Sequence, residues 1–215
     1  MKKMDTVPYK GYSINVYADT SCQSPDEWED ESVFLVAFHR DFFVKRDGFS
    51  QGVCQSIMRG GKYEDDSICY EAKDIMKKYH IFGLEAYIHS GVSLSLSYEG
   101  NYPDRRWDVS QLGLVFVAKT DARTKVKAKK LALGLIEDWN NSLSGNVYGF
   151  MIEKDGEESG GCWGFSGDYA KSGLIDHAKD EIDGEIKSRV AKHTRKLKAF
   201  ISQNVPLEKR VACTA

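Results

Sequence analysis

The sequence predicts an α+β fold: an antiparallel or mixed sheet covered by helices, with a long amphipathic helix near the C-terminus. Short segments of period-2 alternation indicate strands, and apolar residues at helical spacing indicate helices. These elements do not alternate in the strict βαβ order of a parallel sheet, which favours helices on one side of the sheet. We expect one domain over residues 1–215, because no linker or internal repeat divides the chain.

The first strands are expected before residue 40. Residues 9–18 alternate apolar and polar side chains, which is the pattern of a half-buried strand. Residues 33–39 form a continuous apolar run of strand length, which is typical of a strand covered on both faces. Residues 40–66 have no clear period, so we expect a long connection that contains short helical pieces.

A helix and two further strands are expected in the middle of the chain. The helix is predicted over residues 67–80, with Ser67 as its N-cap and Gly83 as its C-terminal stop. Residues 92–98 alternate apolar side chains with serines, which predicts a strand. Residues 112–118 are continuously apolar and predict a buried strand.

Two helices and a hairpin complete the predicted order. Thr120 is the expected cap of a helix that ends at about Leu143. The pair Asp155-Gly156 predicts a hairpin turn between strands at 146–153 and 160–165.

The C-terminal helix is expected over about 174–203 and ends before Pro206. We expect its apolar stripe to pack on the rest of the domain, across the sheet; the stripe consists of Ile175, Ala178, Ile182, Ile186, Val190, Leu197, Phe200 and Ile201.

The composition is that of a globular protein with reduced thiols. Apolar residues make up 41% and charged residues 29%, which argues against wholesale disorder. The basic N-terminal residues are not followed by the apolar segment of a secretory signal, and no apolar run is long enough for a membrane span. The five cysteines are widely spaced without a CxxC motif. We therefore expect a cytoplasmic protein, with no membrane partner, no cofactor and no metal.

The charge is distributed unevenly. From Lys171 onward the chain has ten Lys/Arg and six Asp/Glu, a charge of +4. Since the net charge of the whole chain is −2, residues 1–170 carry −6. Six basic residues on the last helix have no acid between them and suit phosphate contacts with nucleic acid. The alternative is that they only complement the C-terminal end of the helix dipole. They are Lys187, Arg189, Lys192, Arg195, Lys196 and Lys198.

An acidic segment with one tryptophan lies before the strand at 33–39. An exposed tryptophan ringed by carboxylates is typical of a contact with a partner protein. The alternative is that Trp28 folds back over the core as a lid. This candidate partner-binding acidic patch consists of Asp26, Glu27, Trp28, Glu29, Asp30 and Glu31.

No catalytic residue is assigned from the sequence, which contains no nucleophile elbow and no phosphate-binding loop. Cys162 lies among glycines on a predicted strand, where a buried structural cysteine is far commoner than a nucleophile. His177, Asp180 and Glu181 have a spacing that can bind a cation. The same residues also suit a solvated polar face near a helix N-terminus, so no metal site is assigned.

Several segments occur together in a fixed order: SPDEW (24–28), FLVAFH (34–39), WDVSQLGLVFV (107–117), GNVYGFMIE (145–153), CWGF (162–165), AKDEIDGEI (178–186) and NVPLEKR (204–210). They resemble a family of uncharacterised proteins common in bacteriophages and other mobile elements. The chain departs from the family pattern at Glu29-Asp30 and at Val109-Ser110. The residues that carry the family motifs are Trp107, Asp108, Gln111, Gly113, Cys162 and Trp163.

The resemblance implies an accessory gene of a mobile element and carries no biochemical activity with it. We predict a protein that binds a host macromolecule, with a host protein as the first expectation, as in counter-defence of the anti-restriction or anti-CRISPR type. The alternatives are a nucleic-acid-binding protein that uses the basic C-terminal helix, and an enzyme with a site near Cys162 and Trp107. At the Trp107 motif we expect a structural corner, where Gln111 satisfies backbone groups of the loop and Gly113 permits close packing.

Overall fold

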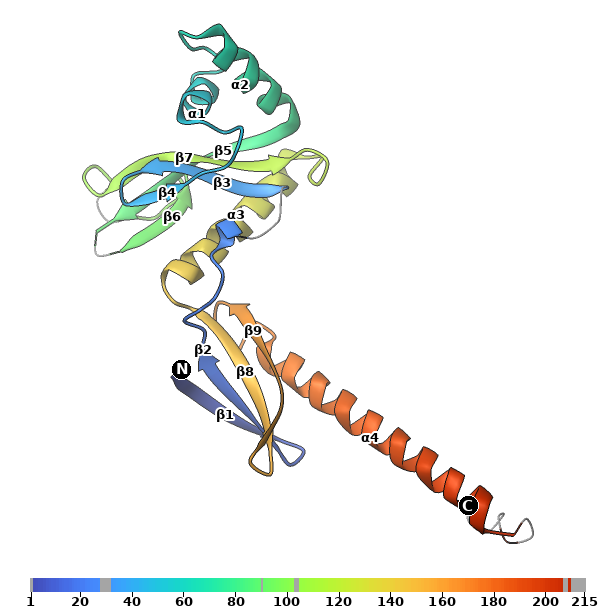
Figure 1. Cartoon of the computed structure of the whole chain (residues 1–215). Coiled ribbons are helices and arrows are strands. Elements are labelled where there is room, and N and C mark those ends of the chain that lie inside the picture. The colour runs from blue at the N-terminus through green and yellow to red at the C-terminus, as the bar shows by residue number, and fades with distance from the viewer. Residues whose placement is uncertain (1, 28–31, 90, 103–104, 207–208, 210–215) are drawn as a thin grey trace. The chain divides into compact units, whose positions relative to one another are not determined.

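The computed structural model describes residues 2–27, 32–89, 91–102, 105–206 and 209 (Figure 1). The chain divides into two compact units: a terminal unit of Met1–Asp19 with Tyr148–Ala215, and a central unit of Thr20–Val147. The central unit has an antiparallel sheet with several helices, and the terminal unit has an antiparallel sheet with the helix α4, so the α+β prediction is confirmed. The single-domain expectation stays a prediction, and each unit is described by itself.

The central unit is built on a five-stranded antiparallel sheet with the order β4-β3-β7-β5-β6. The central strands β3 and β7 pair with Leu35 opposite Val115. Both strands are apolar along most of their length, which is why they occupy the middle of the sheet. The strand bounds are β3 Val33–His39, β4 Phe42–Val44, β5 Tyr79–Ile88, β6 Val92–Leu96 and β7 Val109–Ala118.

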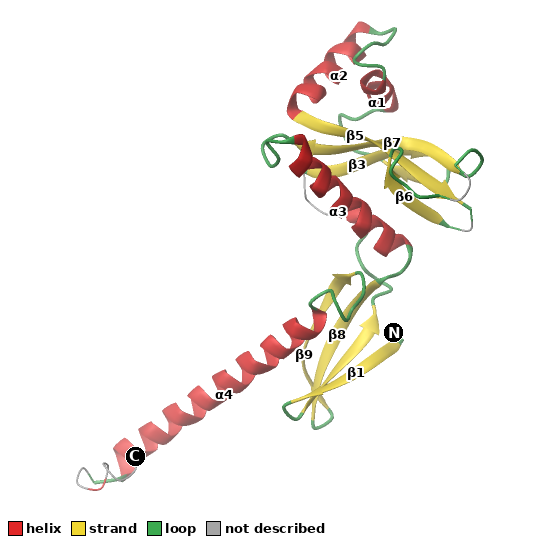
Figure 2. Ribbon diagram, turned by 180° about the vertical axis from the view of Figure 1, so that it is seen from behind, coloured by secondary structure: helices red, strands yellow, loops and turns green. Residues whose placement is uncertain are grey.

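Helices cover both faces of this sheet, with α3 on one side and α1 and α2 on the other (Figures 1 and 2). Their bounds are α1 Gln51–Met58, α2 Asp66–Lys78 and α3 Lys125–Leu143. The expected continuous apolar strand at 33–39 is therefore buried from both sides. The expectation of helices on one side is wrong for this unit, because β3 alternates Phe34 and Val36 toward α1 and α2 with Leu35 and Ala37 toward α3.

The terminal unit has a four-stranded sheet with the order β1-β2-β8-β9, covered by α4. The expected hairpin turn is present, because Asp155 and Gly156 both have positive φ angles of 53° and 84°, as a two-residue hairpin turn requires. The core lies between the sheet and α4 and contains Tyr12, Ile14, Val16, Phe150, Ile152, Leu174, Ala178 and Ile182. The bounds are β1 Lys3–Tyr9, β2 Tyr12–Ala18, β8 Val147–Lys154, β9 Glu157–Ser166 and α4 Leu174–Asn204.

The long C-terminal helix forms as predicted, but only its first part packs on the sheet. Beyond Ile186 three apolar residues of the stripe are exposed, Val190 by 59%, Leu197 by 48% and Phe200 by 62%, while Ile201 is half-buried. The expectation that the whole stripe packs across the sheet is therefore wrong. A helix of 31 residues is about 46 Å long, whereas a ten-residue strand spans about 33 Å, so the sheet cannot cover it. None of the helices in the described part of the chain combines the length and apolar character that crossing a bilayer demands.

Three expected helix boundaries are corrected. Asp65 rather than Ser67 caps α2, because its carboxylate accepts hydrogen bonds from the backbone N–H and hydroxyl of Ser67 at 2.8 and 2.7 Å. Thr124 rather than Thr120 caps α3. Gly83 does not stop a helix: it lies within β5, where an added Cβ would lie 2.3 Å from Ser97 Oγ.

Candidate functional site

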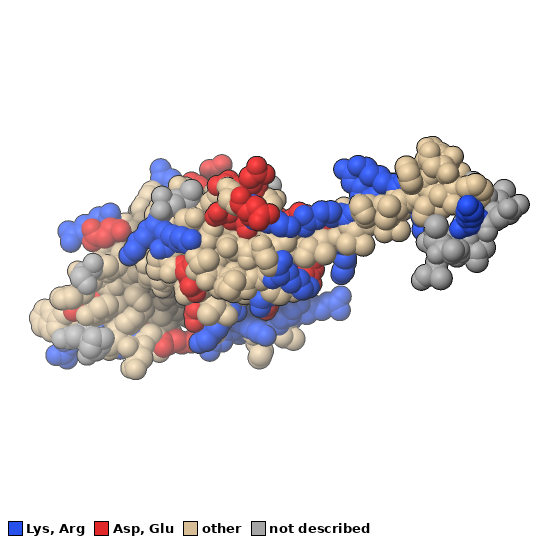
Figure 3. Space-filling view, turned by 90° about the horizontal axis from the view of Figure 1, so that it is seen from below, with Lys and Arg blue, Asp and Glu red and all other residues tan. Residues whose placement is uncertain are grey.

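The basic residues predicted on the last helix lie on the exposed part of α4. All six are exposed, and no acid occurs between Ile186 and Asn204. In the space-filling view, blue basic side chains alternate with uncharged surface along this projecting helix (Figure 3). The six are Lys187, Arg189, Lys192, Arg195, Lys196 and Lys198.

Arg189 connects α4 to the sheet of the terminal unit. Its guanidinium donates to the Tyr12 hydroxyl and lies 3.7 Å from Glu185, so it ties α4 to β2. Lys192, Arg195, Lys196 and Lys198 make no ion pair with any described residue. The basic surface open to a partner is therefore formed mainly by these last four side chains.

The same part of α4 presents an apolar stripe. At about 100° per residue, Val190, Leu197 and Phe200 fall within an arc of about 80°. The four basic side chains from Lys192 to Lys198 lie outside that arc. The distal half of α4, which we define as residues 187–204, thus presents an apolar stripe and a basic face on one amphipathic helix.

The acidic patch is only partly within the described residues. Asp26 and Glu27 are exposed on η1 (Pro25–Glu27), while the rest of the patch, Trp28, Glu29, Asp30 and Glu31, lies outside the described residues. Both alternatives for Trp28 therefore stay predictions.

The motif around Trp107 forms a corner in the central unit. The backbone N–H of Ile88 donates to the carbonyl oxygen of Asp108 at 2.9 Å, and Trp107 is exposed. Gly113 permits close packing as predicted, because an added Cβ would lie 1.9 Å from the carbonyl oxygen of Val36. Gln111 differs from the prediction, since it donates to the Ser97 hydroxyl at 2.5 Å and not to backbone.

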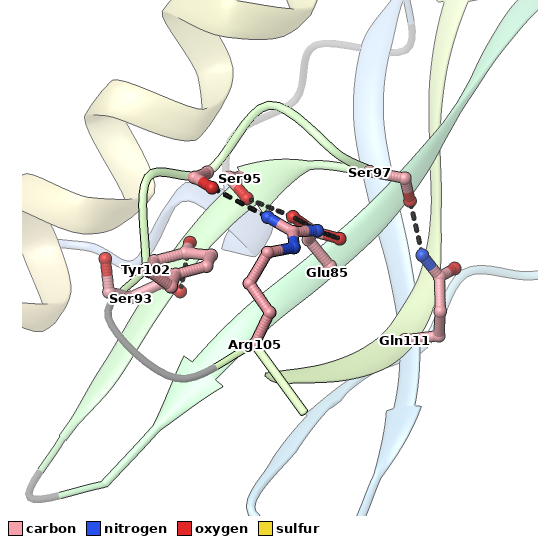
Figure 4. Close-up of polar contacts among 8 residues, drawn as sticks. Glu85, Ser93, Ser95, Ser97, Tyr102, Arg105 and Gln111 are labelled. Carbon is pink, nitrogen blue, oxygen red and sulfur yellow. Dashed lines mark hydrogen bonds and ion pairs between the residues drawn. The ribbon is translucent and has the colours of Figure 1, made fainter. Parts of the chain in front are cut away.

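An ion pair between the half-exposed Arg105 and a buried carboxylate anchors the loop that precedes this corner (Figure 4). Glu85 is only 2% exposed, and Arg105 Nη2 lies 2.8 Å from each of its carboxylate oxygens. Arg105 also donates to the carbonyl oxygen of Gly100, and Ser95 donates to Glu85. Burial raises the pKa of Glu85, but the hydrogen bonds from Tyr98 backbone, Arg105 and Ser95, with the Arg105 charge, outweigh it and leave the pKa lowered.

The CWGF segment lies on β9 of the terminal unit. Cys162 packs against the apolar core under α4, whereas Trp163 lies over Gly149, where an added Cβ would meet its ring at 2.1 Å. Trp107 belongs to the central unit, so no site containing both Cys162 and Trp107 is described. The enzyme alternative gains no geometric support from this placement.

Among the described residues, neither the other cysteines nor the set His177, Asp180 and Glu181 forms a site. Burial raises the pKa of Cys54 to about 12, so its thiol stays protonated near neutral pH. The ring of His177 packs against Phe150 and Phe165, with centroids 5.8 and 5.7 Å away. Within the described ranges, no group of three or more His, Cys, Asp or Glu could hold a metal ion.

A cavity of about 740 Å³ in the central unit was not predicted. It lies between α3, η1 and the adjoining parts of β3 and β4. Its lining comes from segments about 90 residues apart, so no local motif reveals it. The lining residues are Pro25, Asp26, Val33, Phe34, Leu35, Val44, Lys45, Arg46, Lys127, Lys130, Leu131, Gly134, Leu135, Asp138 and Trp139.

Comparisons with family models, with curated proteins and with solved structures found no match. The resemblance to the mobile-element family therefore stays a prediction.

Proposed function

We propose that this protein acts by binding a partner protein, and that the distal half of α4 docks as a helix into an apolar groove with an acidic rim. The observation that carries the proposal is the exposure of an apolar stripe and a basic face on one helix. Helices recognised in grooves use anchors at i, i+3, i+4 and i+7. Val190 and Leu197 are at i and i+7, and Leu197 and Phe200 are at i and i+3.

The apolar stripe favours a protein over nucleic acid. Phosphate contacts would account for Lys192, Arg195 and Lys196 but would leave Leu197 and Phe200 in water. Burial of an exposed leucine or phenylalanine stabilises a complex by about 1.5–3 kcal/mol, so a partner that covers both faces gains more. The anchors are also separated by His193 and Thr194, which suits discrete pockets more than a continuous lipid surface.

A second copy of this chain is a poor partner for the same surface. Pairing two such helices along Leu197 would bring the basic flanks of one copy against those of the other, because no acid lies between Ile186 and Asn204. Like charges beside a helix interface disfavour pairing. An acidic groove neutralises the same charges and accelerates association.

The mobile-element resemblance suggests which partner to test first. We propose a bacterial host protein, and within that class a component of a restriction or CRISPR defence. Phage plating on defence-positive and defence-negative strains tests this narrower proposal. Protection that requires Leu197 supports it, and equal plating with or without the protein contradicts it.

Substitution of Leu197 by aspartate is expected to abolish docking, because it places a carboxylate in the apolar groove. A photo-crosslinking amino acid at position 200, introduced in bacterial cells, should give one discrete protein adduct. The adduct should disappear with Leu197→Asp and persist with Ala199→Asp, which adds the same charge on the opposite side of α4. With the purified partner, Leu197→Asp should weaken binding by at least about 30-fold.

Variants of the same surface also test whether nucleic acid or a lipid membrane is the partner in place of a protein. Gel shifts with DNA and RNA at low and moderate salt, and flotation with anionic vesicles, are compared for Leu197→Asp and for Lys192→Gln with Arg195→Gln and Lys196→Gln. A gel shift that depends on the basic residues and salt but not on Leu197 would replace our proposal by nucleic-acid binding. Vesicle binding that requires Leu197, without a protein adduct, would also overturn it.

A further inference from the structure

The cavity of the central unit has the size and lining of a small-molecule site. Its volume of about 740 Å³ lies within the range of roughly 300–1,000 Å³ that is usual for ligand pockets. Leu35 and Val44 of the sheet face Leu131, Leu135 and Trp139 of α3 across it. The indole of Trp139 is fixed by an edge-on contact with Phe42 at 5.1 Å between centroids. This wall can take an apolar chain or ring.

The charged residues of the lining are predominantly basic. Lys45, Arg46, Lys127 and Lys130 line the cavity together with two acids, Asp26 and Asp138. The guanidinium of Arg46 lies 4.0 Å from the centre of the Phe34 ring, which packs toward α1 and α2, and the ammonium of Lys45 lies 5.4 Å from the centre of the Phe43 ring, so these two charges are held on aromatic rings of the sheet. Lys127 and Lys130 are exposed and have no ion pair among the described residues. The cavity therefore joins an apolar wall to a cationic rim formed by Lys127 and Lys130.

The placement of these lysines is unfavourable for the helix itself. The N-terminal end of a helix carries partial positive charge, so Asp and Glu are favoured there. The first turn of α3 contains no acid and has lysines at positions 125 and 127, and Lys129 and Lys130 follow in the second turn. Among the residues that the structure describes, Lys129 alone of these four has an ion-pair partner, Glu99 at 2.7 Å. An arrangement that lowers helix stability is expected where the charges serve binding.

Gly134 keeps the helix wall of the cavity open. It lies in the middle of α3, where glycine is unfavourable relative to alanine, and no atom lies within 4 Å of an added Cβ. A side chain at this position would extend toward the space that Leu131, Gly134 and Leu135 border.

From this geometry we infer that the cavity binds a small anionic amphiphile, with an apolar chain or ring against Trp139 and a carboxylate near Lys127 and Lys130. The site is in the central unit and is independent of the docking proposed for α4. It assigns the chain a ligand-binding activity besides macromolecule binding.

The test uses the full chain and two probes of equal chain length and opposite charge, decanoate and decyltrimethylammonium, below their micellar concentrations. Titration calorimetry should show saturable binding of one decanoate and at least about tenfold weaker binding of the cation. Hydrogen exchange should then slow in residues 131–139. Gly134→Phe should abolish binding by filling the cavity, whereas Gly134→Ala should retain it.

Lys127→Glu distinguishes a binding role from a structural one. It should weaken the binding of decanoate about five- to tenfold, because it replaces a cation of the rim by an anion. It should raise the Tm of the free protein by about 1–3 °C, because it removes a cation from a helix N-terminus. If Gly134→Phe does not fold, Leu131→Trp serves as the variant that fills the cavity, because Leu131 lines it and is half-buried. Equal affinity for both probes, binding of several decanoates insensitive to Gly134→Phe, or no binding at all would each overturn the inference.

Discussion

Substitution of Gly113 by alanine is expected to destabilise the central unit by at least about 3 kcal/mol, beyond the usual cost of one added methyl group in a packed core. An added Cβ would lie 1.9 Å from the carbonyl oxygen of Val36 and 3.0 Å from Cα of Ala37. Both atoms are backbone, so no side chain can rotate to make room. Strands β3 and β7 would have to separate in the middle of the sheet.

Hydrogen exchange measured by mass spectrometry tests this prediction for each unit. Peptides from β7 should lose protection in Gly113→Ala, while peptides from β8 in the terminal unit report on the rest of the chain. Gly134→Ala is the matched control, because the same methyl group there meets no atom within 4 Å. It should stabilise the central unit by about 0.5–1 kcal/mol. Equal protection of β7 in the wild type and in Gly113→Ala would contradict the close approach.

Arg105→Ala is expected to cost about 2–4 kcal/mol, because it leaves the carboxylate of Glu85 buried without its cation. The loop held at Gly100 by the same guanidinium would also be released. Glu85→Gln should cost less, since Arg105 is partly exposed and can be solvated. The double variant should therefore be more stable than Arg105→Ala alone, as urea denaturation will measure.

The contribution of Glu85 to folding stability should change with pH in opposite directions in the wild type and in Arg105→Ala. In the wild type the folded pKa of Glu85 lies below its usual value, so this contribution to stability is present above the unfolded pKa and lost as pH falls through the folded pKa. In Arg105→Ala, burial without the cation should raise the folded pKa. The stability difference between the two proteins should then shrink from about pH 7 to about pH 4. A difference that does not change with pH would mean that Glu85 is not held as an anion by Arg105.

Strands with strong burial could be predicted from the sequence, whereas exposed strands could not. Residues 33–39 form β3 with the predicted bounds, because burial on both faces makes every position apolar. In contrast, β1 is mostly exposed and contains Pro8, so it has neither an apolar period nor the composition of an inner strand. The strand β4 has three residues, too few to establish a period.

Contacts between distant segments could not be predicted either, because a local pattern does not specify which other segment it will pack against. Ile14 lies opposite Ile152 in the sheet of the terminal unit, but nothing in the local pattern of either strand specifies its partner. The cavity likewise joins β3 and β4 to α3. A local signal for its cationic rim did exist, since Lys127 lies in the first turn of α3, where a helix favours acids. The exposed half of α4 was predicted as a helix and as basic, but its length relative to the sheet became clear only in three dimensions.

The attachment of α4 also bears on how fast its distal half can find a partner. The buried residues Leu174, Ala178 and Ile182 hold the first turns in helical form, so later turns extend an existing helix and avoid the unfavourable nucleation step. A partner that captures Leu197 and Phe200 then meets an ordered segment and does not wait for it to fold. The association rate should be governed by diffusion and charge steering, and the lifetime of the complex by the two apolar anchors.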